Sequence, residues 1–484
     1  MSDEVRALEP QVLWNYFADL NEVPRGSKKE KKAIEFAKNF GESLGLETMV
    51  DQTGNVIIKK PATAGMEDKG IIALQSHLDM VHQKNADTDF DFDTQGIQMY
   101  VEGDWVKAKG TTLGADNGIG VAAIMTLLAS DDIPHPALEA LLTMDEETGM
   151  TGAKGLQGGL LDAKVMLNLD TEDDDELTIG CAGGIDVTAD GSYNQVSLDG
   201  DNKSFTLSMK GLTGGHSGME IQLGRGNANK LMNRFLTELA NDVEVSIHAI
   251  DGGGLRNAIP RESSATISVS TSNLDKFQNV VSDFNQILAV EYATTDAGAE
   301  LVAEPIDGVG TALDAEFQSK LLKGIYACPS GIYRMSPDIE GLVQTSNNLA
   351  RVLVKDGQYQ ILCLTRSSST SEKNDEVNAI RGAFELMGAN VSTAGSYPGW
   401  EPKPEAGIVK LMQQLYSEMY KEEAHVSAIH AGLECGILGT NYPDIEMISF
   451  GPNIRGAHSP DEKAQISSVQ KFWSYLLETL KKTA

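Results

Sequence analysis

The chain has 484 residues, of which 41% are hydrophobic and 23% charged, a balance typical of globular proteins with two or three domains. Its 39 Lys and Arg against 70 Asp and Glu give a formal net charge of −31, which argues against nucleic acids and anionic membranes as partners. Four scattered cysteines, an acidic N-terminus without an apolar segment, and the lack of an apolar run of about 20 residues favour a cytoplasmic location.

Helices and strands are expected to alternate over the first 180 residues or so. Apolar residues at helical spacing predict helices at 10–20, 27–44 and 118–128. Short apolar runs predict strands at 56–58, 70–74, 138–143 and 165–169. This alternation predicts an α/β fold with a mostly parallel, helix-covered sheet.

The pattern changes after the glycine-rich segment 180–184. Strand-like alternation at 204–210 and 264–271 flanks a predicted helix near 228–241, and a second set of helices and strands follows up to residue 387. We interpret this region as an α+β domain of two similar halves, inserted into the first domain. A segment rich in Pro and Gly at 395–404 is the expected return linker.

A Ser-His-Leu-Asp segment, which includes His77 and Asp79, follows the predicted strand at 70–74. Open α/β sheets bind ligands at the carboxyl ends of their strands, so both residues are candidate site residues. Residues i and i+2 of an extended strand point the same way, so Asp79 can share a site with His77 or orient its imidazole from behind. Taken alone, the segment also fits a buried core histidine.

Four further segments place carboxylates or a histidine at the ends of apolar runs. They contain Asp116 in Gly-Ala-Asp-Asn-Gly, Glu146 and Glu147 in Asp-Glu-Glu-Thr-Gly, Asp170 in Leu-Asp-Thr-Glu, and His458 in Ala-His-Ser-Pro-Asp. Each segment alone also fits a turn or a solvated surface. Together with His77, they match the ligands of two Zn²⁺ ions, which need a histidine and a carboxylate each and one bridging carboxylate.

The predicted metal ligands are His77 and Asp170 for one ion, His458 and Glu147 for the other, and Asp116 as the bridge. Three carboxylates and a bridging hydroxide would balance the charge of two Zn²⁺ ions. Glu146 then remains free to act as a general base towards the bridging water, while Asp79 orients His77. Imidazole and carboxylate ligands suit Zn²⁺, and Mn²⁺ or Co²⁺ are alternative occupants.

These five motifs, in this order, resemble those of the cocatalytic dizinc exopeptidases, a family that includes carboxypeptidase G, aminoacylase, carnosinase and peptidase T. The segments 211–218, 256–260 and 430–436 are similar to those of its aminoacyl-histidine dipeptidase branch. The resemblance implies a zinc exopeptidase-like catalytic domain at 1–186 and 401–484, with a lid domain inserted at 187–400. A lid of this length is similar to that of monomeric dipeptidases, and shorter relatives complete their site in a dimer. Both a monomer and a homodimer are therefore compatible with the sequence.

The resemblance also implies a set of substrate-binding residues. His216 is implied to polarise the scissile carbonyl, and the guanidinium of Arg366 suits a free C-terminal carboxylate, which Asn257 could also hold. His430 and Glu434 lie among glycines that suggest close substrate approach, and Glu434 could pair with a substrate ammonium. The alternatives are a loop histidine at 216, a surface arginine at 366 and a capped helix start at 430–434.

The leading hypothesis is a zinc-dependent dipeptidase that hydrolyses Xaa-His and other unblocked dipeptides, with β-alanyl-histidine among the candidate substrates. Two alternatives in the same family are an aminotripeptidase and an N-acyl-amino-acid deacylase, which would need no free substrate amine. A non-enzymatic metal-binding protein on the same scaffold is disfavoured, because the base and all five ligands are present.

Overall fold

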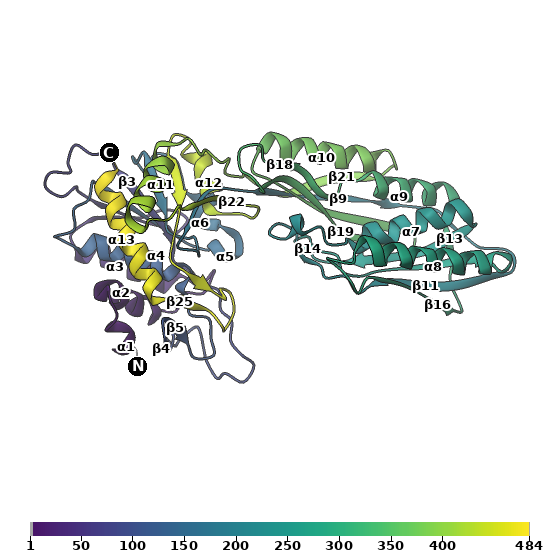
Figure 1. The fold of residues 1–484 in the computed structure, drawn as a ribbon, viewed down its shortest axis with the longest axis horizontal. Coiled ribbons are helices and arrows are strands. Elements are labelled where there is room, and N and C mark those ends of the chain that lie inside the picture. The colour runs from purple at the N-terminus through teal and green to yellow at the C-terminus, as the bar shows by residue number, and fades with distance from the viewer. Residues whose placement is uncertain (1–2, 484) are drawn as a thin grey trace. The chain divides into compact units, whose positions relative to one another are not determined.

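The computed structural model describes residues 3–483, which form two compact units. The first unit takes in the chain up to Gly180, Pro402–Ala428 and the chain from Leu433 onward. The second unit consists of Cys181–Glu401 and the short segment Ile429–Gly432. It appears in teal and green in Figure 1, and the first unit holds the purple and yellow segments. None of the helices within residues 3–483 combines the length and the apolar character that a membrane span requires.

An eight-stranded sheet in the order β1-β2-β6-β3-β7-β23-β8-β22 is the centre of the first unit. Its strands are β1 (Glu47–Val50), β2 (Val56–Lys60), β3 (Ile72–His77), β6 (Leu138–Thr143), β7 (Val165–Asn168), β8 (Glu176–Cys181), β22 (His425–Ile429) and β23 (Glu446–Ser449). The central strands β6, β3, β7 and β23 are parallel, whereas β2 joins β6 and β8 joins β23 in antiparallel fashion. The predicted α/β class is confirmed, with antiparallel flanks.

The antiparallel pairing of β1 with β2, at one end of the sheet, has a local cause. Asp51 accepts hydrogen bonds from the backbone N–H groups of Thr53, Gly54 and Asn55, which forms a tight turn between β1 and β2. A turn this short can join only antiparallel strands.

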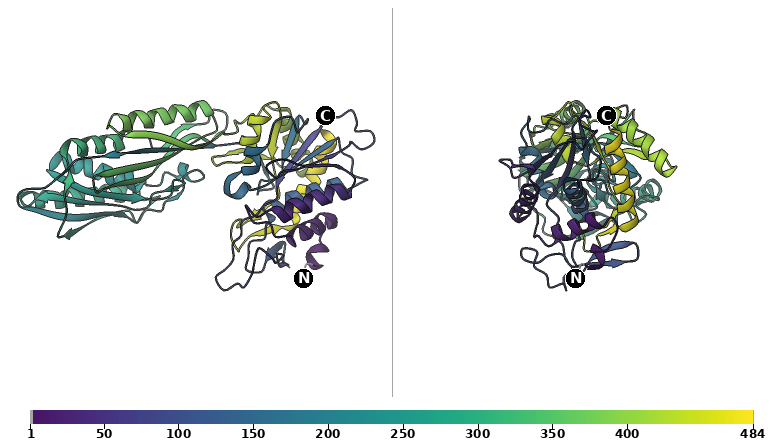
Figure 2. Two further views of the ribbon diagram at one scale, coloured as in Figure 1. Left: turned by 180° about the vertical axis from the view of Figure 1, so that it is seen from behind. Right: turned by 90° about the vertical axis from the view of Figure 1, so that its left-hand side faces the viewer.

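Helices cover the sheet of the first unit. They are α1 (Asp3–Arg6), α2 (Gln11–Asn21), α3 (Lys31–Ser43), α4 (Ala115–Ala129), α5 (Glu146–Gly149), α6 (Thr151–Gly155), α11 (Gly407–Tyr420), α12 (Glu434–Asn441) and α13 (Ile466–Lys482). Helix α4 is buried along most of its length between β3 and α2. Figure 2 shows the purple N-terminal helices and the yellow α13 in this same unit.

A second, four-stranded sheet in the first unit has the order β24-β25-β5-β4. It consists of β4 (Met99–Glu102), β5 (Trp105–Ala108), β24 (Ile454–Arg455) and β25 (Lys463–Gln465). The pairing of β25 with β5 fixes the loop that carries His458 to a segment more than three hundred residues earlier in the chain.

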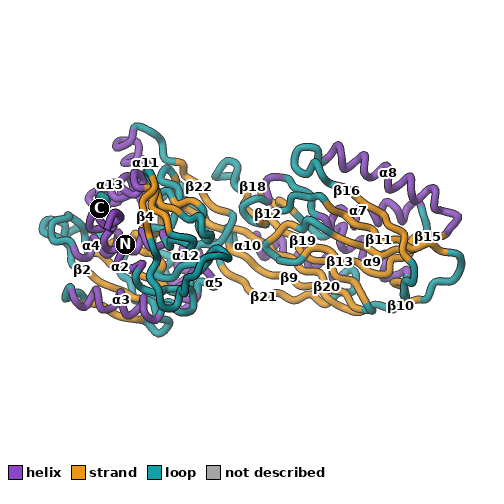
Figure 3. The backbone as a smooth tube through the Cα atoms, turned by 90° about the horizontal axis from the view of Figure 1, so that it is seen from below, coloured by secondary structure: helices purple, strands orange, loops and turns teal. Residues whose placement is uncertain are grey.

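The second unit contains one continuous sheet in the order β16-β11-β15-β13-β19-β20-β9-β21, with β18 paired to β19 (Figure 3). The strands are β9 (Gly183–Ser192), β11 (Asn202–Lys210), β13 (Val245–Gly253), β15 (Ser263–Ser270), β16 (Glu300–Ile306), β18 (Gly331–Met335), β19 (Val343–Lys355), β20 (Gln358–Ser367) and β21 (Asn390–Tyr397). The helices are α7 (Ala228–Asp242), α8 (Leu274–Glu291), α9 (Ala315–Ala327) and α10 (Thr370–Glu385). Short strand pairs are β10 (Gln195–Val196) with β17 (Ala312–Leu313), and β12 (Gly215–His216) with β14 (Ala258–Ile259).

The two halves of this sheet have the same topology. Elements β11, α7, β13, β15, α8 and β16 form one βαββαβ set, and β9, α9, β19, β20, α10 and β21 form the other. In each set the fourth strand lies next to the first, followed by the third and the second. The halves join edge to edge through β13 and β19 and share one hydrophobic core. The prediction of two similar halves is thus confirmed in topology.

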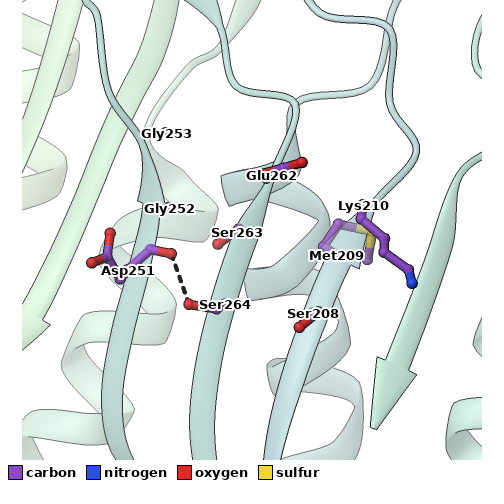
Figure 4. Close-up of a pocket in the computed structure, with 9 residues that line it drawn as sticks. All are labelled: Ser208, Met209, Lys210, Asp251, Gly252, Gly253, Glu262, Ser263 and Ser264. Carbon is purple, nitrogen blue, oxygen red and sulfur yellow. Dashed lines mark hydrogen bonds between the residues drawn. The ribbon is translucent and has the colours of Figure 1, made fainter.

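A groove with a volume of about 440 Å³ lies over β11, β13 and β15 of the second unit (Figure 4). It is lined by Ser208, Met209, Lys210, Asp251, Gly252, Gly253, Glu262, Ser263 and Ser264. This lining includes none of the site residues predicted from the sequence, so the groove is separate from the candidate site.

Candidate metal centre

The five predicted metal ligands come together within the first unit. His77 is the last residue of β3, Asp170 follows β7, Asp116 begins α4, Glu147 lies in α5, and His458 lies between β24 and β25. Strands β6, β3 and β7 are parallel, so their carboxyl ends meet at one edge of the sheet. Three of the five residues lie at or shortly after these strand ends, as the sequence pattern predicted: His77 ends β3, Asp170 lies just beyond β7, and Glu147 follows β6 in α5.

Asp116 lies between the two histidines. The distance from His77 Nε2 to Asp116 Oδ1 is 3.1 Å, and that from His458 Nε2 to Asp116 Oδ2 is 3.2 Å. His77 Nε2 is also 3.5 Å from Asp170 Oδ1, while His458 Nε2 is 2.9 Å from Glu147 Oε2. The donor atoms of each of these two triads lie within 4.8 Å of one another. The carboxylate of Asp116 belongs to both triads.

The chemistry of these donors fits a pair of cations. Glu147 Oε1 and Asp170 Oδ1 are buried and have no hydrogen-bond partner among the described residues. Buried oxygens of this kind are costly unless a donor or a cation satisfies them. Hydrogen bonds with Asp116 and Glu147 raise the pKa of His458 to about 11, so the surrounding carboxylates strongly favour positive charge at this point. Two metal ions would supply it.

Asp79 connects two of the segments that carry candidate ligands. Its Oδ1 lies 3.4 Å from His77 Nδ1, which is the contact expected from the sequence. It also accepts hydrogen bonds from the backbone N–H groups of Glu146 (3.0 Å) and Glu147 (3.2 Å), and from the hydroxyl of Ser27 (2.8 Å). Burial opposes the charged form, but His77 and these donors outweigh it and lower the pKa of Asp79 to about 2. Asp79 therefore fixes both the imidazole and the start of α5.

Glu146 lies beside the candidate ligands. Its carboxylate forms a group with His77 and Glu147 in which the potential ligand atoms are within 4.8 Å of one another. Burial raises the pKa of Glu146 well above its usual value, and the neighbouring carboxylates Asp170, Glu434 and Glu147 raise it further. A carboxyl group beside the candidate ligands with a raised pKa is suited to accept and return a proton.

Glu434 is the first residue of α12 and is fully buried in the first unit. Its Oε2 accepts hydrogen bonds from Gln75 Nε2 and Thr143 Oγ1, both at 2.6 Å, while Oε1 has no partner among the described residues. Burial raises its pKa to about 7. The helix start considered in the sequence analysis is present, and an ammonium partner for Oε1 stays a prediction.

The other four predicted substrate-binding residues lie in the second unit, three of them around one glycine. A Cβ atom at Gly218 would lie 2.3 Å from the backbone oxygen of His430, 3.1 Å from His216 Cε1 and 3.2 Å from Arg366 Nε. Only glycine leaves room for this approach. Asn257 contacts the residue before Gly218: its backbone oxygen accepts a hydrogen bond of 2.8 Å from the N–H of Ser217.

The hydrogen bonds of His216 determine its tautomer. Its Nδ1 accepts from the backbone N–H groups of Gly218 (3.2 Å) and Met219 (3.0 Å), so the proton of the neutral ring is on Nε2. Burial lowers the pKa of His216, and the positive charge of Arg366 lowers it further, which keeps the ring neutral. His216 thus presents an N–H donor. Arg366 donates to the hydroxyl of Tyr397 at 3.0 Å, and His430 Nε2 lies 2.7 Å from the hydroxyl of Ser346.

The sequence patterns did not identify two buried charged residues of the site, Arg25 and Glu462. Arg25 is 1% exposed and Glu462 is 3% exposed, and both bind the backbone of segments that carry candidate ligands. Pro24-Arg25-Gly26 is typical of a turn, and Asp461-Glu462 is typical of a solvated acidic pair. Because these roles arise from contacts distant in sequence, no local pattern could have identified them.

Comparison with known proteins identifies the family. The model of Peptidase family M20/M25/M40 matches residues 73–482, a range that includes all five candidate ligands. The chain belongs to this family. It is 42% identical to the cytosol non-specific dipeptidase of Escherichia coli (strain K12) over 478 residues, which is 99% of each chain.

Solved structures of related peptidases share the fold. The crystal structure of aminoacylhistidine dipeptidase from Vibrio alginolyticus matches with a TM-score of 0.95 and 40% identity, over 100% of this chain and 99% of that one. A tripeptidase from Staphylococcus aureus matches with a TM-score of 0.56 and 17% identity over 98% of both chains, which shows the fold alone. The resemblance to the exopeptidase family and the predicted fold class are both confirmed by these matches.

Proposed function

We propose that this M20/M25/M40 peptidase is a metallo-dipeptidase that hydrolyses Xaa-His and other unblocked dipeptides. One observation carries the proposal. Asp116 is shared by two triads of histidine and carboxylates, in a chain 42% identical to a dipeptidase over its full length. The proposed ligands are His77, Asp116, Glu147, Asp170 and His458. Their imidazole and carboxylate donors suit two Zn²⁺ ions, with Mn²⁺ or Co²⁺ as substitutes.

The chain's own residues have distinct roles in the proposed reaction. When bound, the metal ions supply Lewis-acid polarisation of the scissile carbonyl and a water of lowered pKa. Glu146 takes a proton from the attacking water and returns it to the leaving amine. Asp79 holds the backbone of Glu146 and Glu147 and keeps the imidazole of His77 in one orientation.

The second unit acts as a lid in this proposal and supplies groups that bind the substrate. The Nε2–H of His216 donates to the carbonyl oxygen as negative charge develops on it. Arg366 binds the free C-terminal carboxylate, with Asn257 and His430 beside it. The Oε1 of Glu434, which has no partner among the described residues, receives the substrate ammonium. The proposed partners are small peptides in the cytosol, in keeping with the name of the Escherichia coli relative.

A metal analysis together with a substrate panel tests this function. The purified chain should bind two equivalents of Zn²⁺, hydrolyse unblocked Xaa-His dipeptides and leave their N-acetylated forms intact. Cleavage of the blocked forms alone would favour the N-acyl-amino-acid deacylase, and release of an N-terminal residue from tripeptides alone would favour the aminotripeptidase.

The role of Arg366 is tested with a free dipeptide and its C-terminal amide. Wild type should prefer the free acid, whereas Arg366→Ala should lose this preference mainly through a higher KM for the acid. His216→Ala should instead lower kcat for both substrates. An unchanged preference in Arg366→Ala would remove this residue from carboxylate recognition.

A further inference from the structure

One buried carboxylate holds the segment that leads into Asp116. Glu462 Oε2 accepts hydrogen bonds from the backbone N–H groups of Leu113 (2.7 Å) and Gly114 (2.9 Å). Its Oε1 accepts from those of Ala115 (2.7 Å) and Asp116 (3.3 Å). A carboxylate has about four lone-pair positions, so four successive peptide groups satisfy it completely. The turn is possible because Gly114 adopts a left-handed conformation with φ 70°.

The same residue lies at the end of the loop that carries His458. The backbone of His458 has a φ of 62°, in the left-handed region that residues other than glycine adopt infrequently. Within this loop Ser459 N–H donates to Gly456 O at 3.2 Å, and Glu462 N–H donates to Ser459 O at 3.1 Å. Glu462 therefore links the loop of one proposed metal ligand to the backbone of another.

Arg25 holds the other side of the same segment. Its Nη2 donates to Gly114 O at 2.5 Å, and its Nη1 donates to Leu78 O (3.2 Å) and Asp79 O (3.1 Å), next to the end of β3. Gly114 thus binds the anionic Glu462 through its N–H and the cationic Arg25 through its C=O. This chain of contacts runs from the loop of His458 through the segment before Asp116 to the end of the strand that carries His77.

We propose that Glu462 is a positioning residue that fixes Asp116 and His458 relative to each other, so that both metal ions bind at full affinity. The inference rests on the proposed two-metal site. Glu462 would touch neither metal nor substrate. It acts through the four peptide groups. A glutamine at this position could accept hydrogen bonds at only one of its two terminal side-chain atoms. In Glu462→Gln, two of the four N–H groups would face an NH₂ group instead of an oxygen.

Glu139 provides a matched control. It is a buried carboxylate of β6 in the same unit and accepts hydrogen bonds from the backbone N–H groups of Asp162 (2.8 Å) and Ala163 (3.0 Å). It also pairs with Lys59 at 2.7 Å. Glu139→Gln makes the same chemical change at a place that contacts no proposed ligand, so it reports the cost of the change to folding alone.

The test measures Zn²⁺ affinity by competition with a chelator, and hydrogen exchange of a peptide covering 113–116 in the metal-free protein. Glu462→Gln should bind at least one Zn²⁺ about 10–100-fold more weakly than wild type, as other residues that orient metal ligands do. It should also lose exchange protection over 113–116, and Glu139→Gln should change neither quantity.

Each other outcome is decisive. Wild-type affinity in Glu462→Gln would overturn the proposal, even with faster exchange, and equal losses in both variants would assign Glu462 to general stability. A wild type that binds no Zn²⁺ would overturn the proposed function together with this inference. If Glu462→Gln does not fold, Glu462→Asp keeps the charge but shortens the reach, and unchanged Zn²⁺ affinity in that variant would overturn the proposal.

Discussion

Two adjacent carboxylates, Glu146 and Glu147, have different surroundings, so replacing each by alanine should impair different properties. Glu147 lies 2.9 Å from His458 and shares a triad with Asp116, whereas Glu146 belongs, within residues 3–483, only to the group formed with His77 and Glu147. Glu146→Ala should keep the bound metal but lower kcat by about 10²–10⁴-fold, the usual cost of a lost general base. Glu147→Ala should lose metal. Measuring metal stoichiometry beside kcat separates the two, and equal metal loss would mean that their roles are reversed or merged.

At the same scale, a buried carboxyl in the second unit should make stability depend on pH. Glu376 on α10 is fully buried, neither of its oxygens has a partner among the described residues, and burial raises its pKa to about 9. The folded state keeps the proton that the unfolded state releases near pH 4.5. Its contribution to stability is therefore complete at low pH and is lost as the pH rises towards 9.

Glu376→Gln should remove this dependence. We expect the variant to be more stable than wild type at pH 8 by on the order of 5 kcal/mol, with the difference shrinking to about 1 kcal/mol at pH 5. Urea unfolding at both pH values measures it. Glu385→Gln, an exposed position on the same helix, is the control. Parallel pH profiles for wild type and Glu376→Gln would contradict the prediction.

At the scale of secondary structure, the approach of α4 to the sheet depends on one glycine. A Cβ atom at Gly120 would lie 2.7 Å from the backbone oxygen of Leu169 and 2.4 Å from Ser76 Oγ. Alanine favours a helix over glycine by about 1 kcal/mol, but forcing the elements apart costs about 1–3 kcal/mol. Because Leu169 precedes Asp170, the same shift would disturb a proposed ligand.

Gly120→Ala should therefore destabilise the chain and weaken metal binding. Gly382→Ala on α10 is the matched control, because a Cβ atom there has no neighbour within 4 Å. That substitution should stabilise the chain by about 1 kcal/mol through helix propensity alone. Thermal unfolding and metal titration of both variants provide the comparison, and a stabilised Gly120→Ala would refute the packing argument.

At the scale of the whole molecule, metal removal should act on one unit. All five proposed ligands lie in the first unit, and the second unit has a hydrophobic core of its own. A metal at about 1,000 times its Kd stabilises the state that binds it by about 4.1 kcal/mol per site. Chelation should therefore lower the unfolding temperature of the first unit and leave the unfolding temperature of the second unit unchanged. Calorimetry with and without chelator measures both, and an equal shift of the two transitions would contradict the assignment.

The sequence allowed the grouping of His77, Asp116 and His458 to be predicted because each lies in a short motif at the end of an apolar run. Local patterns report local structure, and the parallel sheet then brings together the strand ends near His77 and Asp170. Asp116 at the start of α4 and His458 between β24 and β25 reach the same place from outside this sheet. The roles of Arg25 and Glu462 depend on partners distant in the chain, so they were not predictable. For the same reason, nothing in the sequence indicated that residues 429–432 pack with the second unit.

The bridge between Cys181 and Trp400 has a practical consequence. The two residues exchange both backbone hydrogen bonds, each 2.9 Å long, so the insertion enters and leaves at one point. Because its ends are adjacent, the inserted segment 182–399, which is most of the second unit, can be removed without separating the residues on either side of it. A linker of a few residues should replace 182–399, and the excised segment, with its two ends joined by a peptide ligase, would be a candidate for a circular protein domain.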